Sequence, residues 1–446
     1  MTKGNATRLI VMFAIPLIIG NVFQQLYTVT DSIIVGRGVG MGTLASIGAV
    51  DWMVWLYFGI IQGFTQGFSI LFSQIFGAGD LKKLRRVRGM AQLISLAVSV
   101  IMVGIGLLIM PAFFNLLNVP ADVAKEAKIY STVIICGLPI FMLYNLYAAS
   151  LRAVGNSKVP LVAIIVAAVS NIIFDLIAVY VLKLGILGAA LATVLAQLIS
   201  GVVCIIAVNK NKDIRTDRED FTFCFDDMKN LLKLGAPIAL QNVVMSASGI
   251  ILQSVANSFG STFIAGEKSA ASIYGVIEIA ALSFSYAIST YVGQNYGAKR
   301  IDRVKEGLKA SWIISMAIAV IIGALTTTFA SNLSGLFLMS ENAGELQAAL
   351  SVGTYYLRIE GLLLPCLYIE YTGRSALQGM GRTLPAVLAS AMELVSRITL
   401  SIWAAAVGNF KLVIWADLSA WVAGAIIIII GYIITTRKIF RQEIVQ

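Results

Sequence analysis

Two aspartates stand inside apolar stretches of the first half of the chain. Asp31 interrupts the first apolar run, and Asp175 lies one helical turn after Asn171 in another run. A spacing of i, i+4 places Asn171 and Asp175 on one helix face, and Thr193 in the next run adds a hydroxyl. An ionised side chain at the bilayer centre costs roughly 2.5–3.5 kcal/mol on insertion scales, so each acid must face a cavity, pair or stay protonated. These oxygen ligands predict a site for H⁺ or Na⁺; the alternative is that the acids only hydrogen-bond to neighbouring helices.

The second half carries a different set of intramembrane charges. Glu393 and Arg397 are spaced i, i+4, and so are Glu370 and Arg374 near the end of their run, which is typical of structural ion pairs. Glu278 has no such partner. We predict that Glu278 and Glu370 line a cavity for cationic substrates. Further charges in or near the apolar runs are Asp51, Arg358, Glu360 and Asp417.

Aromatic and amide side chains near the middle of the apolar runs form a candidate pocket lining. Attraction of a cation by an aromatic face is worth about 0.5–2 kcal/mol, although aromatic residues in membrane spans more often serve packing or interface belts. The candidate substrate-contacting residues of this kind are Gln24, Tyr27, Phe58, Tyr144 and Asn145.

The sequence lacks the residues and motifs that several kinds of chemistry require. The chain has no histidine, which removes the commonest metal ligand and the usual proton carrier near neutral pH. The four cysteines show no CxxC spacing, and there is no phosphate-binding loop of the GxxxxGK[ST] type. The sequence therefore predicts neither an enzyme nor an ATP-driven pump, and neither a cofactor nor a resident metal.

The composition is that of a membrane protein. Of 446 residues, 58% are hydrophobic and only 13% are charged, about half the charged share of a soluble domain. Twelve apolar runs are each long enough to span a bilayer, six on either side of a hydrophilic stretch. We predict an all-α integral membrane fold with a lobe at 1–208, a cytoplasmic linker at 209–233 and a second lobe at 234–446, each lobe having six transmembrane helices.

The basic residues set the predicted orientation. Lys and Arg concentrate at both termini, in the linker and in alternate loops, such as those that begin at Lys82 and Lys299. This asymmetry places both termini in the cytoplasm of a multi-pass plasma-membrane protein. The net charge of +10 is then a feature of loops beside the lipid bilayer, and we predict no nucleic-acid partner and a monomer.

The two halves resemble each other. Gln74-x-Phe76-Gly77-Ala78 matches Gln294-x-Tyr296-Gly297-Ala298, each just before a basic loop, and Leu151-Arg152-x-x-Gly155 matches Leu377-Gln378-x-x-Gly381. Ordered matches of this kind indicate an internal duplication. Six spans per repeat give parallel repeats, an arrangement in which secondary transporters bind substrate between the lobes near the bilayer midplane.

Nearly the whole chain resembles the multidrug and toxic compound extrusion (MATE) family, in its prokaryotic DinF-like branch. The resemblance rests on the features above together with Ile15-Pro16, Gly188-Ala189-Ala190-x-Ala192 and Pro160. It implies two six-helix lobes in a V shape, with alternating access that exchanges a drug for an inward-moving cation. The cation-site motif of the DinF-like branch falls on Asp31, Asn171, Asp175 and Thr193. The acidic C-lobe Na⁺ site of another branch is not clearly reproduced, which leaves H⁺ and Na⁺ both open.

The sequence thus predicts a secondary active multidrug efflux antiporter that exports cationic amphipathic small molecules in exchange for H⁺ or Na⁺. The alternative is a flippase or exporter of a lipid-linked or polar metabolite, from the wider group of multidrug, oligosaccharidyl-lipid and polysaccharide exporters. A flippase for a pyrophosphate-linked lipid needs a basic cavity. The predicted spans instead hold more acids than arginines.

Overall fold

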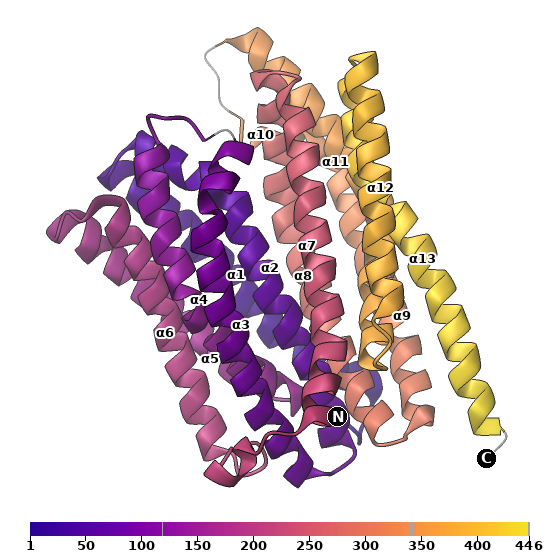
Figure 1. Ribbon diagram of the computed structural model, residues 1–446. Helices are drawn as coiled ribbons and strands as arrows, with labels where there is room; N and C mark the ends of the chain where they lie inside the picture. The colour runs from indigo at the N-terminus through magenta and orange to yellow at the C-terminus, as the bar shows by residue number, and fades with distance from the viewer. Residues whose placement is uncertain (118, 339–341, 445–446) are drawn as a thin grey trace. The chain divides into compact units, whose positions relative to one another are not determined.

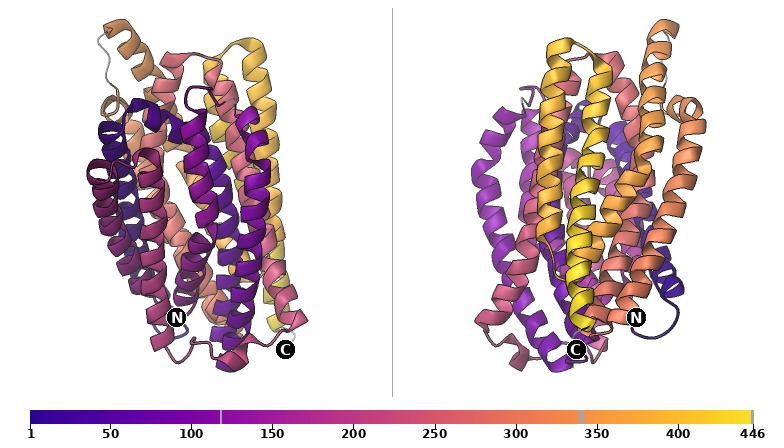
Figure 2. Two further views of the ribbon diagram at one scale, coloured as in Figure 1. Left: turned by 60° about the vertical axis from the view of Figure 1, so that its left-hand side comes forward. Right: turned by 90° about the vertical axis from the view of Figure 1, so that its right-hand side faces the viewer.

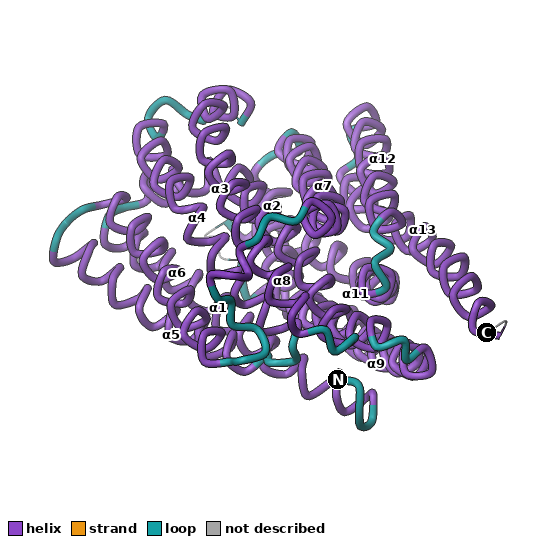
Figure 3. The backbone as a smooth tube through the Cα atoms, turned by 60° about the horizontal axis from the view of Figure 1, so that its bottom comes forward, coloured by secondary structure: helices purple, strands orange, loops and turns teal. Residues whose placement is uncertain are grey.

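The computed structural model describes residues 1–117, 119–338 and 342–444, and these residues are helical almost from end to end (Figure 1). The tube view shows helices joined by short loops, with no strand in this part of the chain (Figure 3). The first half contains α1 (Ala6–Gly38), α2 (Met41–Gly77), α3 (Leu81–Leu116), α4 (Ala124–Ala153), α5 (Lys158–Leu176) with the π-helical turn η1 (Ile177–Val181), and α6 (Gly185–Lys210). The second half contains the 3₁₀ turn η2 (Arg218–Phe221), α7 (Phe225–Asn257), α8 (Ser261–Gly297), α9 (Ile301–Thr328), α10 (Ala330–Gly335), α11 (Ala343–Gly379), α12 (Leu384–Val407) and α13 (Phe410–Ile444).

Twelve of these helices are long, and eleven are also apolar enough to cross a membrane. The exception is α11, which has the length but carries Arg358, Glu360, Glu370 and Arg374 along it. Large apolar side chains point outward on many helices; Leu108, for example, is 80% exposed. Such a surface fits lipid and not water, so the predicted all-α membrane fold is confirmed.

The helices are longer than the apolar runs that predicted them. Helix α3 begins at Leu81, before the basic residues of its first two turns, and α7 begins at Phe225, inside the predicted linker. Only the hydrocarbon core demands apolar residues, whereas straight-chain charged residues are good helix formers. The helices therefore continue past the point at which the apolar pattern ends.

The described chain forms two compact units. One comprises Met12–Asn242, and the other comprises Met1–Val11 together with Val243–Gln446. Two helices change unit along their length, α1 after Val11 and α7 after Asn242. The unit boundaries thus lie inside the first helix of each half and not in a loop.

Small residues allow close helix packing in the unit Met12–Asn242. A Cβ on Gly63 of α2 would lie 2.3 Å from the Cα of Ala239 of α7, and one on Gly67 would lie 2.4 Å from the Cα of Gly235. Gly63 and Gly67 are spaced i, i+4 on α2, and Gly235 and Ala239 have the same spacing on α7. This is the small-xxx-small pattern by which helices approach closely in membranes. The Asn242 side chain adds a hydrogen bond to the carbonyl of Gly59 at 2.7 Å.

The other unit is built in a similar way around α11, which packs against α8, α9 and α13. A Cβ on Gly323 of α9 would lie 2.4 Å from the carbonyl oxygen of Gly361 of α11. Helices α12 and α13 lie side by side, as the yellow ribbons in the right panel of Figure 2 show. Their polar residues contribute to the buried charges described below.

Candidate functional site

The Asp31 and Asp175 carboxyl groups lie close to each other in the unit Met12–Asn242. Asp31 lies on α1 and Asp175 on α5, where its side chain is fully buried. Two carboxylates can only accept hydrogen bonds, so a bond between them requires that one carry a proton. The pair predicted from sequence is therefore brought together, and its geometry is that of two acids able to share one cation.

Asn171 extends this arrangement by one helical turn. Its side chain is 1% exposed, and neither its amide nitrogen nor its oxygen has a hydrogen-bond partner among the described residues. Both oxygens of Asp175 and Oδ1 of Asp31 are likewise buried without a donor within that part of the chain. Buried polar groups are normally paired, and those that are not are candidates for ligand binding.

A small cavity of about 20 Å³ adjoins Asn171. A cavity of roughly 10–15 Å³ is enough for one water molecule, so this one accommodates a water molecule or a small cation. Its wall is formed by Gln24, Tyr27, Tyr144, Ile164, Ala167, Asn171, Thr193, Ala196, Gln197 and Ser200. The predicted residues Thr193, Gln24, Tyr27 and Tyr144 thus gather at one place.

The hydroxyl groups at the cavity are oriented by their neighbours. The Thr193 hydroxyl donates to the carbonyl of Ala189 in its own helix at 3.1 Å, which leaves its lone pairs available to a cation. The Tyr27 side chain hydrogen-bonds to those of Gln24 and Gln197. The lining therefore offers amide and hydroxyl oxygens, the ligand type that hard cations prefer.

The backbone changes form directly after Asp175. Helix α5 ends at Leu176, and the π-helical turn η1 follows at Ile177–Val181. Gly38 at the end of α1 packs against this turn, since a Cβ there would lie 2.4 Å from Cγ1 of Val179. Single π-helical turns are frequent at functional sites. This one continues α5, which carries Asp175, and packs against the end of α1, which carries Asp31.

Two predicted lining residues lie away from the cavity, whereas Gln197 and Ser200 at its wall were not predicted. Phe58 packs on Phe141 at a centroid distance of 4.6 Å, and the Asn145 amide donates to the Phe141 carbonyl in its own helix at 2.9 Å. Gln197 and Ser200 follow Thr193 at i+4 and i+7. This polar stripe in an otherwise apolar run is the sequence signal that would have found them.

The other unit contains a buried chain of ion pairs between α11, α12 and α13. Arg374 pairs with Glu370 and, at 3.2 Å, with Glu393. Arg397 lies 3.9 Å from Glu393 and 3.0 Å from Asp417. Because Glu393 lies between both arginines, the two predicted i, i+4 pairs belong to one network.

The remaining acids of this unit lie outside the ion-pair chain. Glu278 accepts a hydrogen bond from the Tyr371 hydroxyl at 2.5 Å. Glu360 is fully buried, and its two carboxyl oxygens have no hydrogen-bond partner in the described ranges. Glu370 is bound to Arg374, so of the two predicted acidic lining residues only Glu278 is without an ion pair there. In the described residues, moreover, no cluster of three or more acids or cysteines is placed to hold a metal ion.

Comparison with known sequences identifies relatives of similar length. The MatE family model matches residues 16–177 and 237–403, more than half of the chain. The probable multidrug resistance protein YoeA of Bacillus subtilis is 27% identical over 350 residues, covering 76% of this chain and 75% of the relative. The multidrug export protein MepA of Staphylococcus aureus is 22% identical over 395 residues, covering 87% of this chain and 86% of the relative.

Solved structures show the same fold. A MOP superfamily transporter from Pyrococcus furiosus superposes with a TM-score of 0.89 at 22% identity, covering 98% of this chain and 97% of that one. A mutant of the Vibrio cholerae MATE transporter VcmN gives a TM-score of 0.89 at 19% identity, with 97% of each chain covered. Together with the family match, this likeness shows that the chain belongs to the MatE family of multidrug and toxic compound extrusion transporters.

Proposed function

We propose that this protein is a secondary active antiporter that exports cationic amphipathic small molecules in exchange for H⁺ or Na⁺, and that it is not an enzyme. We place it in the plasma membrane with both termini in the cytoplasm, as a monomer whose repeats span 1–208 and 234–446. One observation carries the proposal, the pair of Asp31 and the fully buried Asp175 with the unpartnered amide of Asn171 beside it. The names of the relatives, multidrug resistance and multidrug export proteins, support the substrate class.

Cation binding at the pair changes the packing of α1 against α5. Two unit charges about 4 Å apart repel by ~4 kcal/mol at an effective dielectric constant of 20. With both carboxyl groups ionised, this repulsion separates the two helices, whereas a bound H⁺ or Na⁺ removes it. The cation therefore binds one packing of α1 better than the other, which is the condition for a ligand to shift a conformational equilibrium.

The drug pocket is proposed on the aromatic and amide residues at the small cavity and on the two acids predicted in the other unit. Gln24, Tyr27 and Tyr144 border the small cavity and contact both the cation site and a substrate in this scheme. Glu278 offers a negative charge to a cationic substrate in the other unit. Glu370 does so less directly, because Arg374 neutralises it.

The test is transport by purified protein in liposomes. A fluorescent organic cation is followed under an imposed pH gradient and, separately, under an imposed Na⁺ gradient. We expect one gradient to drive transport in the unmodified protein and both Asp31→Asn and Asp175→Asn to abolish it. Asp122→Asn is the control, because this carboxylate is exposed in the turn before α4 and its loss leaves transport intact.

Two outcomes would contradict different parts of the proposal. Normal gradient-driven transport in both aspartate variants contradicts the cation site. The absence of gradient-driven transport for every organic cation tested contradicts the antiporter and favours the flippase, whose substrate is a lipid-linked or polar metabolite.

A further inference from the structure

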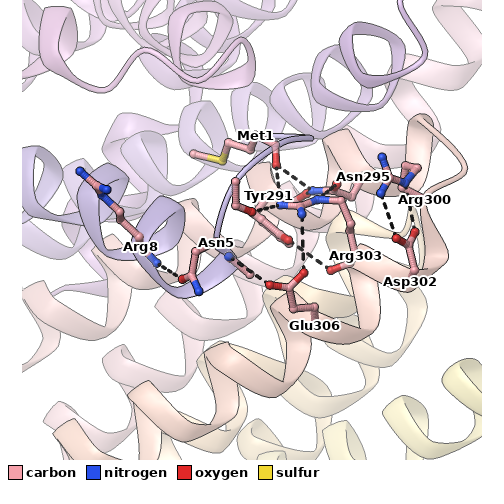
Figure 4. Close-up of polar contacts among 11 residues, drawn as sticks. Met1, Asn5, Arg8, Tyr291, Asn295, Arg300, Asp302, Arg303 and Glu306 are labelled. Atoms are coloured by element: carbon pink, nitrogen blue, oxygen red, sulfur yellow. Dashed lines mark hydrogen bonds and ion pairs between the residues drawn. The ribbon is translucent and has the colours of Figure 1, made fainter.

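A first strap, residues 1–5 before α1, is held by α8 and α9 in the unit that also contains Val243–Gln446 (Figure 4). The Arg303 guanidinium donates to the Gly4 carbonyl at 2.7 Å and to the Met1 carbonyl at 3.5 Å. Asn295 also donates to the Met1 carbonyl, at 3.4 Å, and accepts from Arg303 at 3.2 Å. Arg303 is only 8% exposed, so the strap supplies acceptors to a buried cation.

The first turn of α1 is held in the same place. The amide of Ala6 donates to the Glu306 carboxylate at 3.3 Å, and Glu306 lies 3.6 Å from Arg303. Ala6 itself is 1% exposed. The beginning of α1 is thus fixed to α9.

A second strap, residues 211–221 before α7, is held by α3 in the unit Met12–Asn242. The fully buried guanidinium of Arg88 donates to the carbonyl of Ile214, which is itself 1% exposed. Gln92 donates to the Thr216 hydroxyl at 3.4 Å. The strap also packs on Gly89, where a Cβ would lie 2.5 Å from the carbonyl oxygen of Asp220.

The start of α7 is held to the same helix. Arg86 of α3 forms an ion pair with Asp227 in the first turn of α7 at 2.7 Å, and Asp227 is 3% exposed. In both halves, therefore, the segment before the first helix is bound to the third long helix of the other half.

Arg88 and Arg303, the two anchors of the straps, make the same kinds of interaction but occupy different positions in the repeat. In each, a buried arginine donates to main-chain carbonyls of a strap, and its guanidinium lies near a tyrosine ring, Tyr147 at 5.1 Å for Arg88 and Tyr291 at 5.8 Å for Arg303. The repeat offset places Lys83, not Arg88, opposite Arg303. The same kind of anchor is therefore built from non-equivalent residues.

Resting on the transport function proposed above, we propose that Arg88 and Arg303 are positioning residues that keep the two straps bound throughout the transport cycle. The N-terminal end of α1 then stays with the unit Val243–Gln446 while the rest of α1, including Asp31, belongs to the other unit. Helix α7 is divided in the converse way. Any relative motion of the units must therefore be taken up within α1 and α7.

The physical reason is the cost of releasing a strap. A hydrogen bond to a charged group favours the bound state by about ten- to hundredfold, and release leaves the donors of a buried arginine unpaired. The Asp227 carboxylate, buried beside Arg86, adds to this cost at the second strap. Release during each turnover is therefore disfavoured at both sites.

The test measures strap exposure directly, in protein whose four native cysteines are replaced by serine. Ala6→Cys, at the start of α1 directly after the first strap, and Ile214→Cys, within the second, report on the two straps through their rates of maleimide labelling in liposomes. We expect slow labelling of both, unchanged during gradient-driven turnover. Arg303→Gln raises labelling at position 6 by roughly tenfold or more without affecting position 214, and Arg88→Gln does the reverse.

Transport is measured on the same variants. Arg303→Gln and Arg88→Gln lower the maximal rate severalfold while the affinity for the organic cation stays unchanged, and Arg303→Lys and Arg88→Lys retain part of the rate. Lys309→Gln on α9 and Lys82→Gln on α3 are the matched controls, because both lysines are exposed on the same helices as the anchors, and both variants behave as the unmodified protein.

Three results overturn the proposal. Faster labelling of either strap during turnover shows that the strap is released in the cycle. Unchanged labelling in the glutamine variants shows that the arginines do not anchor the straps. Increased labelling with an unchanged rate shows that anchoring plays no part in transport. If the unmodified protein transports no cation, the proposed function fails, while the labelling of the resting protein still tests the anchors.

Discussion

The close approach of α2 and α7 predicts a large difference between two glycine substitutions on one helix. A Cβ on Gly67 would lie 2.4 Å from the Cα of Gly235, whereas ordinary contacts begin at 3.4 Å. The obstacle is backbone, so Gly67→Ala requires the two helices to separate by about 1 Å. Overpacking of this kind costs about 1–3 kcal/mol.

Gly48→Ala on the same helix is the control, because nothing lies within 4 Å of a Cβ at that position. It gains the helix propensity of alanine, about 0.5–1 kcal/mol. The same gain offsets part of the clash at Gly67, which leaves Gly67→Ala about 1–2 kcal/mol less stable than the unmodified protein. The two variants therefore change stability in opposite directions.

Thermal unfolding in detergent measures this difference. Cys204 is fully buried, so its reaction with a thiol-reactive fluorophore reports unfolding in protein whose three other cysteines are replaced by serine. We expect the midpoint to fall by a few °C for Gly67→Ala, at roughly 2–4 °C per kcal/mol, and to stay or rise for Gly48→Ala. Equal midpoints for the two variants would refute the close packing of α2 on α7.

Two further substitutions test other parts of the structure. Arg397→Met removes an ion-pair partner from the buried Glu393 and from the partly buried Asp417, so we expect the free energy of unfolding to fall by about 3–5 kcal/mol; an unchanged midpoint would contradict the ion-pair network. Tyr27→Phe removes the hydroxyl that bonds Gln197, so substrate affinity measured by fluorescence titration falls roughly two- to tenfold at unchanged stability. Unaltered affinity would place Tyr27 outside the pocket.

Much of the proposed cation site was predictable from the sequence because its signals are local. Asp31 and Asp175 stand out as charges in apolar runs, and the i, i+4 spacing of Asn171 and Asp175 fixes a shared helix face. Their meeting across two helices is a tertiary contact. It followed from the family resemblance and from the cost of leaving each acid alone in the membrane.

The straps were not predictable in the same way. The sequence predicted Arg88 and Arg303 to be ordinary basic residues of loops, because the neighbouring residues do not distinguish a buried arginine from an exposed one. The polar composition of the linker predicted a simple connection. It gave no sign of the main-chain carbonyl that Arg88 binds, because every residue carries such a group. Likewise, the i, i+4 rule found the pairs of Glu370 and Glu393 with their own helix but not the bond from Arg374 to Glu393 across two helices.

The most direct test of the central claim is to count the cations displaced when an organic cation binds. Purified protein is titrated with a lipophilic organic cation in weakly buffered detergent, and released protons and displaced ²²Na⁺ are counted together. We predict the release of H⁺ or of Na⁺ by the unmodified protein, and none by Asp175→Asn, which still binds the organic cation. Equal release by the unmodified protein and by Asp175→Asn would show that the coupling cation binds elsewhere.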